Sequence, residues 1–243
     1  MIYMINNIET YKCLLNDILQ TDPGSPGDDI AGELLGVKVV FDPSNEHLPA
    51  IEQYVDAEMR WYLSQDLNIK GHAGIEDNKI WRTVASPDGN VNSNYGWCVY
   101  SSENYDQFHC ALRAICDNIF TKRASMIYSR PSIHFDWNDD VHAHKDAICT
   151  IYTQVEIRMV DNDYVMDYHV HMRSNDAWYG MRNDYRWHVF VMKELARRVE
   201  LKTGKHIKLG FIRWFADSLH IYKWAVPTVK AFLKGDTNEN SGI

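Results

Sequence analysis

The sequence predicts an α+β fold built around one hydrophobic core. The chain has 243 residues, of which 45% are hydrophobic and 24% are charged, an ordinary balance for a globular protein of this length. Segments with helical spacing of apolar residues are interspersed with segments in which every second residue is apolar. No repeat, linker or low-complexity stretch divides the chain, so we expect a single domain over residues 1–243 with about eight flexible residues at the C-terminus.

Charge and cysteine usage narrow the classes of partner and compartment. The net charge of -8 argues against a nucleic-acid polymer or an anionic membrane as the main partner. No apolar run approaches the roughly 20 residues that cross a bilayer, and the first residues do not resemble a secretory signal. The five cysteines form no CxxC pair. An odd number of unpaired thiols predicts a cytoplasmic protein, in the host cell if it is phage-encoded.

The first 65 residues predict a helix, a strand and a second helix. Residues 7–20 have apolar residues at helical spacing, and residues 34–41 read as a strand. The polar turn 42–45 then predicts the start of a helix over about 46–65.

Glu58 falls on the apolar side of that second helix. The side is made by Ile51, Tyr54, Val55, Met59 and Tyr62. A carboxylate on a core-facing stripe is costly unless it is partnered or has a function. The alternative is a Glu at the edge of the stripe, reaching water or a nearby cation. The pattern alone leaves both interpretations open.

The next elements are a short piece, a turn and a long helix. Residues 80–85 are short extended or helical, and Pro87–Asn90 is a turn. The polar and aromatic stretch 92–97 includes Gly96, which would allow a ligand to approach closely. Residues 103–119 carry apolar residues at spacings of three and four, which predicts a helix.

Residues 132–146 are rich in side chains that could bind a metal. They include His134, Asp136, Asp139, Asp140, His142 and His144. Their loop-like setting lacks a paired helical signature such as HExxH, so we interpret them as a solvated loop and expect no metal.

Two strands follow, each with one informative residue. Strict alternation over 147–159 places Cys149 on the interior face, where a cysteine is usually structural. Residues 164–172 alternate as well, and Arg173 leaves the polar face at the end of that strand. A helix over 185–201, a strand over 205–215 extended by 218–222, and a helix over 223–234 complete the chain.

Arg173 and Ser174 stand where the strand gives way to the helix. Guanidinium, hydroxyl and a neighbouring helix start can direct donors at one phosphate. The alternative is a surface turn in which Arg173 pairs with a nearby aspartate.

Several blocks, in order and approximate spacing, resemble the thymidylate synthase superfamily over residues 54–224. They are Glu58–Tyr62, Ile80–Ser86, Asn92–Trp97, Arg123–Ser132, Cys149–Thr150, Met172–Asp176 with Gly180 and Arg182–Tyr185, and Ser218–Tyr222. The similarity is greatest to the phage-type deoxycytidylate hydroxymethylase branch. It implies a large mixed β-sheet packed with helices, sheet-to-sheet homodimers, and 5,10-methylenetetrahydrofolate as co-substrate.

The resemblance also implies roles for individual residues. Cys149 would add to carbon 6 of a pyrimidine, activating carbon 5 towards the one-carbon unit. Glu58 would manage protons and order the water, and burial would help it to hold a proton. The 5′-phosphate would meet Arg173 and Ser174, with Lys122 and Arg123 reaching across the dimer. His220 and Tyr222 would bind the sugar hydroxyl, while Asp176, Trp81 and Tyr95 would face the folate.

Asp184 is the sharpest clue to the substrate. It stands eleven residues after Arg173, where the synthases carry an asparagine that reads uracil. A carboxylate repels the uracil carbonyl but accepts from the cytosine amine, which favours a cytidylate. The resemblance therefore predicts a hydroxymethyltransferase for dCMP, with CMP also open. The rivals are thymidylate synthase-type methylation of dUMP and a non-catalytic nucleotide- or RNA-binding relative.

Overall fold

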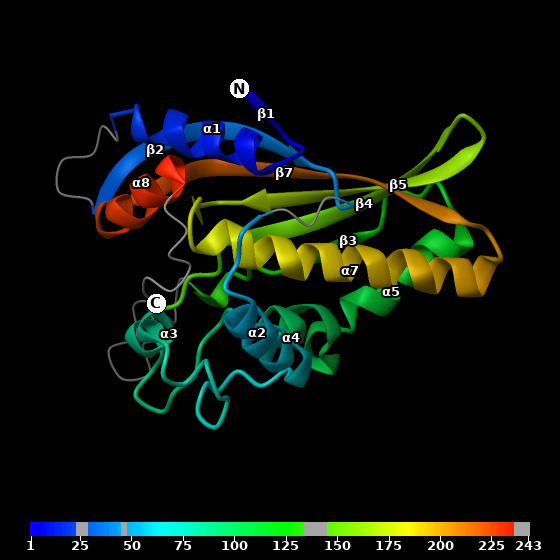
Figure 1. Cartoon of the computed structure of the whole chain (residues 1–243). Helices are drawn as coiled ribbons and strands as arrows, with labels where there is room; N and C mark the ends of the chain where they lie inside the picture. The colour runs from blue at the N-terminus through cyan, green and yellow to red at the C-terminus, as the bar shows by residue number, and fades with distance from the viewer. Residues whose placement is uncertain (23–28, 45–47, 134–144, 236–243) are drawn as a thin grey trace. The chain divides into compact units, whose positions relative to one another are not determined.

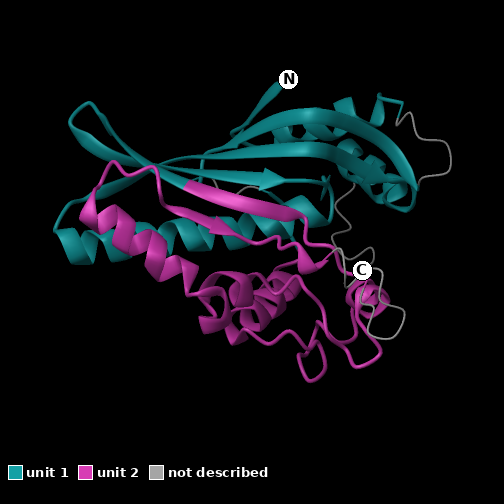
Figure 2. Ribbon diagram, turned by 180° about the vertical axis from the view of Figure 1, so that it is seen from behind, with its two compact units in different colours: residues 1–50, 155–242 teal, residues 51–154, 243 magenta. Residues whose placement is uncertain are grey.

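The computed structural model describes residues 1–22, 29–44, 48–133 and 145–235. It forms two compact units, Met1–Ala50 with Val155–Gly242 (unit 1) and Ile51–Gln154 with Ile243 (unit 2) (Figure 2). Mixed strand directions and several helices confirm the α+β class. Among the described residues, no helix combines the length and hydropathy needed to span a membrane.

Unit 1 is built on long strands of a mixed sheet. Parallel β1 (Ile2–Ile5) pairs with β2 (Ile30–Phe41), which runs antiparallel to β7 (Ile207–Tyr222). Both β5 (Asp163–Met172) and the two-residue β6 (Asn175–Asp176) run parallel to β7. The strand order in the described part of the chain is β1-β2-β7-β5-β4-β3. β4 (Thr150–Val160) begins in unit 2 and ends in unit 1.

The register between β5 and β7 places apolar core residues of unit 1 on one face of the sheet. Tyr168, Val170 and Met172 pair with Ile212, Trp214 and Ala216, and all six are buried. Helix α7 (Gly180–Thr203) runs along these strands (Figure 1). Its fully buried residues include the predicted line Trp187, Val191, Leu195 and Val199. The pattern that predicted this helix was therefore correct, although the helix begins five residues earlier than expected.

The ends of unit 1 fold as predicted, with one strand that the sequence analysis missed. Helix α1 (Ile8–Leu19) begins at a capping box between Asn7 and Thr10. The 3-10 turn η2 (Lys223–Ala225) and helix α8 (Val226–Lys234) follow β7. The missed strand is β1, for which the sequence analysis predicted no element.

Unit 2 holds shorter helices, and two of them begin later than the sequence predicted. Its elements are α2 (Glu52–Ser64), α3 (Lys79–Val84), α4 (Tyr95–Tyr100), the 3-10 turn η1 (Ser102–Asn104), α5 (Gln107–Asp117) and β3 (Ser125–Ile127). Helix α2 starts six residues later than predicted. Pro49 disfavours helical backbone at Leu48, and Ile51, the residue before the helix, has extended backbone. Helix α5 starts four residues late, because Tyr105 and Asp106 have left-handed backbones.

Gly96 packs against protein backbone, which corrects its predicted role beside a ligand. A Cβ built on Gly96 would lie 1.7 Å from the carbonyl oxygen of Tyr62 in α2. Any side chain would therefore force α4 away from α2, and the glycine is needed for helix packing.

Candidate functional site

The predicted site residues divide between the two units. Unit 1 carries Arg173, Ser174, Asp176, Asp184, His220 and Tyr222, and unit 2 carries Glu58, Trp81, Tyr95, Lys122, Arg123 and Cys149. We describe the two sets separately, beginning with unit 2.

Cys149 is half-buried, which corrects its prediction as an interior residue. Inward positions are Ile148 and Thr150 before the strand's irregularity, then Thr153, Val155 and Ile157 after it. At the change of phase, the Ile151 carbonyl accepts from both the Tyr128 and Ser129 amides, at 3.0 and 3.2 Å. Two successive half-buried residues, Ile151 and Tyr152, interrupt the alternation at this point, so the inward positions shift by one residue. The thiol is thus on the partly accessible side.

The segment leading to Cys149 is held by the buried side chain of Asp146. Its carboxylate accepts from the Asn92 and Ser93 amides at 2.7 and 2.6 Å, and from the Ser93 hydroxyl at 2.7 Å. Asn92 Nδ2 returns a bond to the Asp146 carbonyl at 2.9 Å. Arg130 donates in turn to Asn92 Oδ1. We call Asp146, Asn92 and Ser93 the Asp146 clamp; sequence reasoning missed it because its halves are 54 residues apart.

Glu58 is buried, with 6% of its surface exposed, so the interpretation as an edge residue is wrong. The Tyr54 hydroxyl donates to Glu58 Oε1 at 2.8 Å, and Trp81 Nε1 donates to the same Tyr54 oxygen at 2.8 Å. Two aligned donors deliver positive dipole towards the carboxyl, and the chain fixes its orientation. We call these three residues the Glu58 chain.

Tyr95 lies inside an aromatic cluster. Its ring stacks on Tyr62 at 5.1 Å and meets Tyr128 edge-on at 5.2 Å. Its hydroxyl accepts from Thr150 Oγ1 at 3.1 Å, and only 3% of the residue is exposed. The contact with Thr150 connects this cluster to the residue directly after Cys149.

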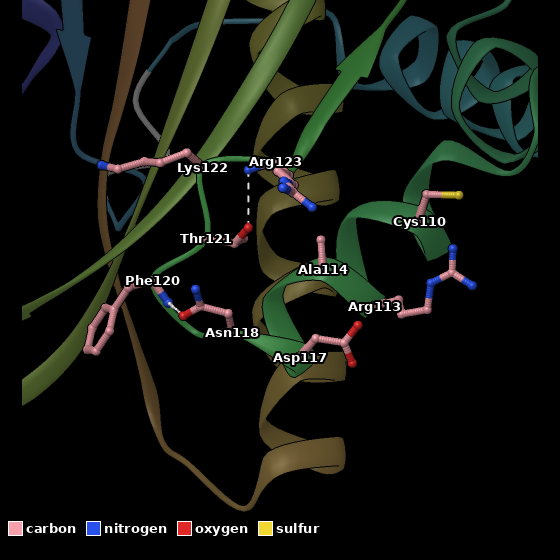
Figure 3. A pocket seen from close by; sticks show the side chains of 9 residues that line it. All are labelled: Cys110, Arg113, Ala114, Asp117, Asn118, Phe120, Thr121, Lys122 and Arg123. Atoms are coloured by element: carbon pink, nitrogen blue, oxygen red, sulfur yellow. Dashed lines mark hydrogen bonds between the residues drawn. The ribbon is translucent and has the colours of Figure 1, made fainter.

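Lys122 and Arg123 are exposed and line a cavity of about 600 Å³ (Figure 3). Its other lining residues are Cys110, Arg113, Ala114, Asp117, Asn118, Phe120 and Thr121. One wall is helix α5 and the other is the segment that follows it. Lys122 extends away from the Arg123 side chain in this view, so the two cations do not converge on one point of the cavity.

In unit 1, Arg173 is exposed and Ser174 is half-buried, but neither adjoins the helix start. Strand β6 intervenes, and α7 begins only at Gly180. Asp176 Oδ1 accepts the Trp178 and Tyr179 amides, at 2.9 and 3.3 Å. Asp176 therefore takes the two amides just before α7, and a phosphate site at Arg173 and Ser174 stays a prediction.

Asp176 is itself a perturbed carboxyl. Burial raises its pKa from 3.8 to about 6, against the lowering effect of the two backbone donors and of Arg182. Arg182 is buried over the Trp178 ring, with 3.9 Å between guanidinium carbon and ring centroid, and it donates to the Pro49 carbonyl at 2.7 Å. Arg182, which the sequence analysis assigned no function, holds the segment between β6 and α7.

Asp184 lies in the second turn of α7, where it is half-buried. Asn175 Nδ2 donates to Asp184 Oδ2 at 3.0 Å. Asn175 is 1% exposed, and its Oδ1 is buried with no hydrogen-bond partner among the described residues. We call these two residues the Asp184 pair.

His220 sits in a chain of polar and aromatic contacts. Ser218 Oγ donates to Glu33, and His220 Nδ1 lies 3.1 Å from the same Ser218 oxygen. Burial lowers the His220 pKa; Glu33 opposes this effect and the nearby Arg173 cation adds to it. The ring meets Tyr222 edge-on at 4.8 Å. Within the described residues, buried His220 Nε2 has no partner, so the ring can take a hydrogen bond from a ligand.

Comparison with known proteins now gives the family. The family model described as thymidylate synthase matches residues 11–242. The chain belongs to the thymidylate synthase family. Curated relatives are the deoxycytidylate 5-hydroxymethyltransferases of Enterobacteria phages T4, T2 and T6. Each is 38% identical over 193 residues, which are 78% of this chain and 75% of the relative. The resemblance stated from sequence motifs is confirmed.

The residues that the structure describes do not form a metal site. They contain no group of three or more His, Cys, Asp or Glu side chains suited to an ion. The stretch from His134 to His144 lies outside the described residues, so the absence of a metal stays a prediction.

Proposed function

We propose that the protein is a folate-dependent cytidylate 5-hydroxymethyltransferase. It would transfer the one-carbon unit of 5,10-methylenetetrahydrofolate to carbon 5 of dCMP, or of CMP, and add water to give the hydroxymethyl product. The relatives named deoxycytidylate 5-hydroxymethyltransferase support this class of reaction. The observation that carries the choice of base is Asp184 on α7, held by Asn175.

Cys149 is the nucleophile in this proposal. Its thiolate bonds to carbon 6 of the pyrimidine, and the electron pair of the 5,6 double bond moves to carbon 5. That carbon bonds to the one-carbon unit and then loses its proton. The bonds from the one-carbon unit to the folate nitrogens break, and tetrahydrofolate leaves with their electrons, which gives an exocyclic methylene. After water adds, the Cys149–carbon 6 bond breaks and the double bond returns. The half-buried position of the thiol and the anchored Asp146 clamp support this role.

Glu58 handles protons and the attacking water. A buried carboxyl can hold a proton at neutral pH, and a fixed orientation makes proton transfer efficient. The Tyr54 and Trp81 donors supply that orientation from behind the carboxyl. Addition of water, rather than transfer of a hydride, defines the hydroxymethyl product.

Asp184 reads the base, and other cations and hydroxyls hold the nucleotide. The Asp184 carboxylate accepts from the cytosine amine, and a proton shared with ring nitrogen 3 adds a second bond. Arg173 and Ser174 bind the 5′-phosphate, together with Lys122 and Arg123 from the second subunit of a sheet-to-sheet homodimer. His220 and Tyr222 bind the sugar hydroxyl, for which the unpartnered His220 Nε2 is suited.

The folate supplies a one-carbon unit at the oxidation level of formaldehyde. Asp176 can contact the pterin, because a buried carboxyl with a pKa near 6 can accept or donate a hydrogen bond around neutrality. Trp81 offers aromatic surface for the same ligand, and Tyr95, whose ring is buried against Tyr62 and Tyr128, supports the folate side from within the protein. Both rings belong to networks already described, which would hold them in place.

Mass spectrometry of reactions that contain dCMP, CMP, dUMP or UMP tests the proposal. Each nucleotide is incubated with the folate donor, and absorbance reports dihydrofolate. We expect a cytidylate to gain one CH2O unit with no dihydrofolate formed. A CH2 gain on dUMP with dihydrofolate would instead establish thymidylate synthase-type chemistry, and no gain on any nucleotide would favour the non-catalytic alternative.

A further inference from the structure

Asn175 has no role in the motifs, and in the proposed mechanism it appears only as the donor to Asp184. Its side chain is almost fully buried, in a two-residue strand whose partner residue is Leu219 of β7. Strand β6 therefore fixes the asparagine backbone on the sheet. From that fixed point, Nδ2 reaches Asp184 Oδ2 at 3.0 Å.

The direction of this hydrogen bond carries chemical information. An amide NH2 group only donates, and a carboxylate oxygen only accepts. The bond therefore suits Asp184 as an acceptor and restrains rotation of its carboxylate plane. An asparagine turned the other way would bring two acceptors together. The hydrogen bond therefore favours one orientation of the Asn175 amide and one orientation of the Asp184 carboxylate.

Stability alone does not explain an asparagine at this position. Its Oδ1 is buried and has no hydrogen-bond partner among the residues that the structure describes. A buried polar atom without a partner destabilises a fold, whereas an apolar side chain of similar volume leaves nothing unpaired. Costs of this kind are retained where a residue serves function.

We propose that Asn175 is a specificity-positioning residue that orients the Asp184 carboxylate for the amino group of a cytosine. The inference rests on the proposed function, since it needs Asp184 as the reader of the base. It adds that base discrimination is a property of two residues on different elements, β6 and α7. Without the amide, that restraint on the carboxylate plane is lost, and with it an acceptor aimed at the amine.

The test is the ratio of kcat/KM for dCMP to that for dUMP, measured on purified full-length variants. We expect Asn175→Leu to lower this ratio about 5- to 50-fold, mostly through the dCMP reaction. The melting temperature should stay near that of the wild type or rise. The matched control is Asn183→Leu, the same replacement beside Asp184, which should leave the ratio within about twofold.

A second arm separates positioning from a merely structural role. Asn175→Leu combined with Asp184→Asn should show the same ratio as Asp184→Asn alone, because the amide acts only through the carboxylate. Asn175→Ser, too short to make the bond, replaces the leucine variant if that one does not fold. An equal loss for both nucleotides, or an unchanged ratio, overturns the inference. If Asp184→Asn also leaves the ratio unchanged, it is the proposed function that fails.

Discussion

The buried carboxyl of Glu58 and the half-buried carboxyl of Asp184 are held in different ways. In the Glu58 chain, donors from Tyr54 and Trp81 run in one direction and end on the carboxyl. In the Asp184 pair, the donor Asn175 leaves its own oxygen buried without a partner within the described ranges. The first arrangement fixes the orientation of a carboxyl, as the proton transfer proposed for Glu58 requires. The second accepts a local cost to aim an acceptor, which suits a group that recognises a ligand.

The largest effect should come from the carboxyl of the Glu58 chain. Glu58→Gln keeps size and the bond from Tyr54 but cannot exchange a proton. We expect kcat for the cytidylate to fall about 10²- to 10⁴-fold, with a smaller change in nucleotide binding. Steady-state kinetics and nucleotide titration measure the two quantities. Retention of full kcat would remove proton transfer from the role of Glu58.

The next largest effect should be on the free energy of unfolding, through the Asp146 clamp. Asp146→Ala leaves the Asn92 and Ser93 donors buried and unpaired, and we expect unfolding to become easier by about 2–4 kcal/mol. Denaturant titration measures this difference. The control Asp117→Ala removes an exposed carboxylate of the same unit and should cost less than about 0.5 kcal/mol. Equal effects of the two replacements would contradict the clamp.

The raised pKa of Asp176 should make the free energy of unfolding depend on pH. Its pKa rises from 3.8 to about 6 on folding, so the folded state binds the proton more tightly than the unfolded state. This contribution is complete below pH 4 and is lost as the pH rises through about 6. Asp176→Asn has no such group. Relative to the wild type, we expect it to gain about 2–3 kcal/mol between pH 4 and 7; parallel stability curves would exclude the raised pKa.

The smallest effect should come from the middle of the Glu58 chain. Tyr54→Phe removes one donor to Glu58 and one acceptor for Trp81 while keeping the carboxyl itself. We expect kcat to fall about 3- to 10-fold, the usual size for one hydrogen bond. Tyr105→Phe is the control in the same unit, because Tyr105 is 85% exposed. A loss as large as that of Glu58→Gln would mean that Tyr54 reacts directly.

The sequence predicted those elements whose hydrophobic period is uninterrupted. The line from Trp187 to Val199 follows a single helix face, and the alternation from Met166 to Met172 follows a single strand face. Local spacing is enough in both, because one neighbouring layer covers each face. Glu58 was recognised in the same way, from its place on an apolar stripe.

The misses arise where a distant residue overrides the local pattern. Cys149 was placed on the wrong face because the alternation of β4 shifts by one residue at Ile151 and Tyr152, where the amides of Tyr128 and Ser129 share the Ile151 carbonyl. Gly96 was assigned to a ligand because its close neighbour, Tyr62, lies on another helix. The Asn175–Asp184 bond joins a strand to a helix, so the local pattern around either residue does not predict the contact.

The most direct test of the account is exchange of the carbon 5 hydrogen of dCMP and dUMP with deuterated water, followed by NMR. Exchange requires a nucleophile to add at carbon 6 of a ring that the protein has bound. We predict exchange of dCMP over dUMP by the wild type, loss of exchange in Cys149→Ala, and a shift towards dUMP in Asp184→Asn. Undiminished exchange in Cys149→Ala, or an unaltered preference in Asp184→Asn, would contradict it.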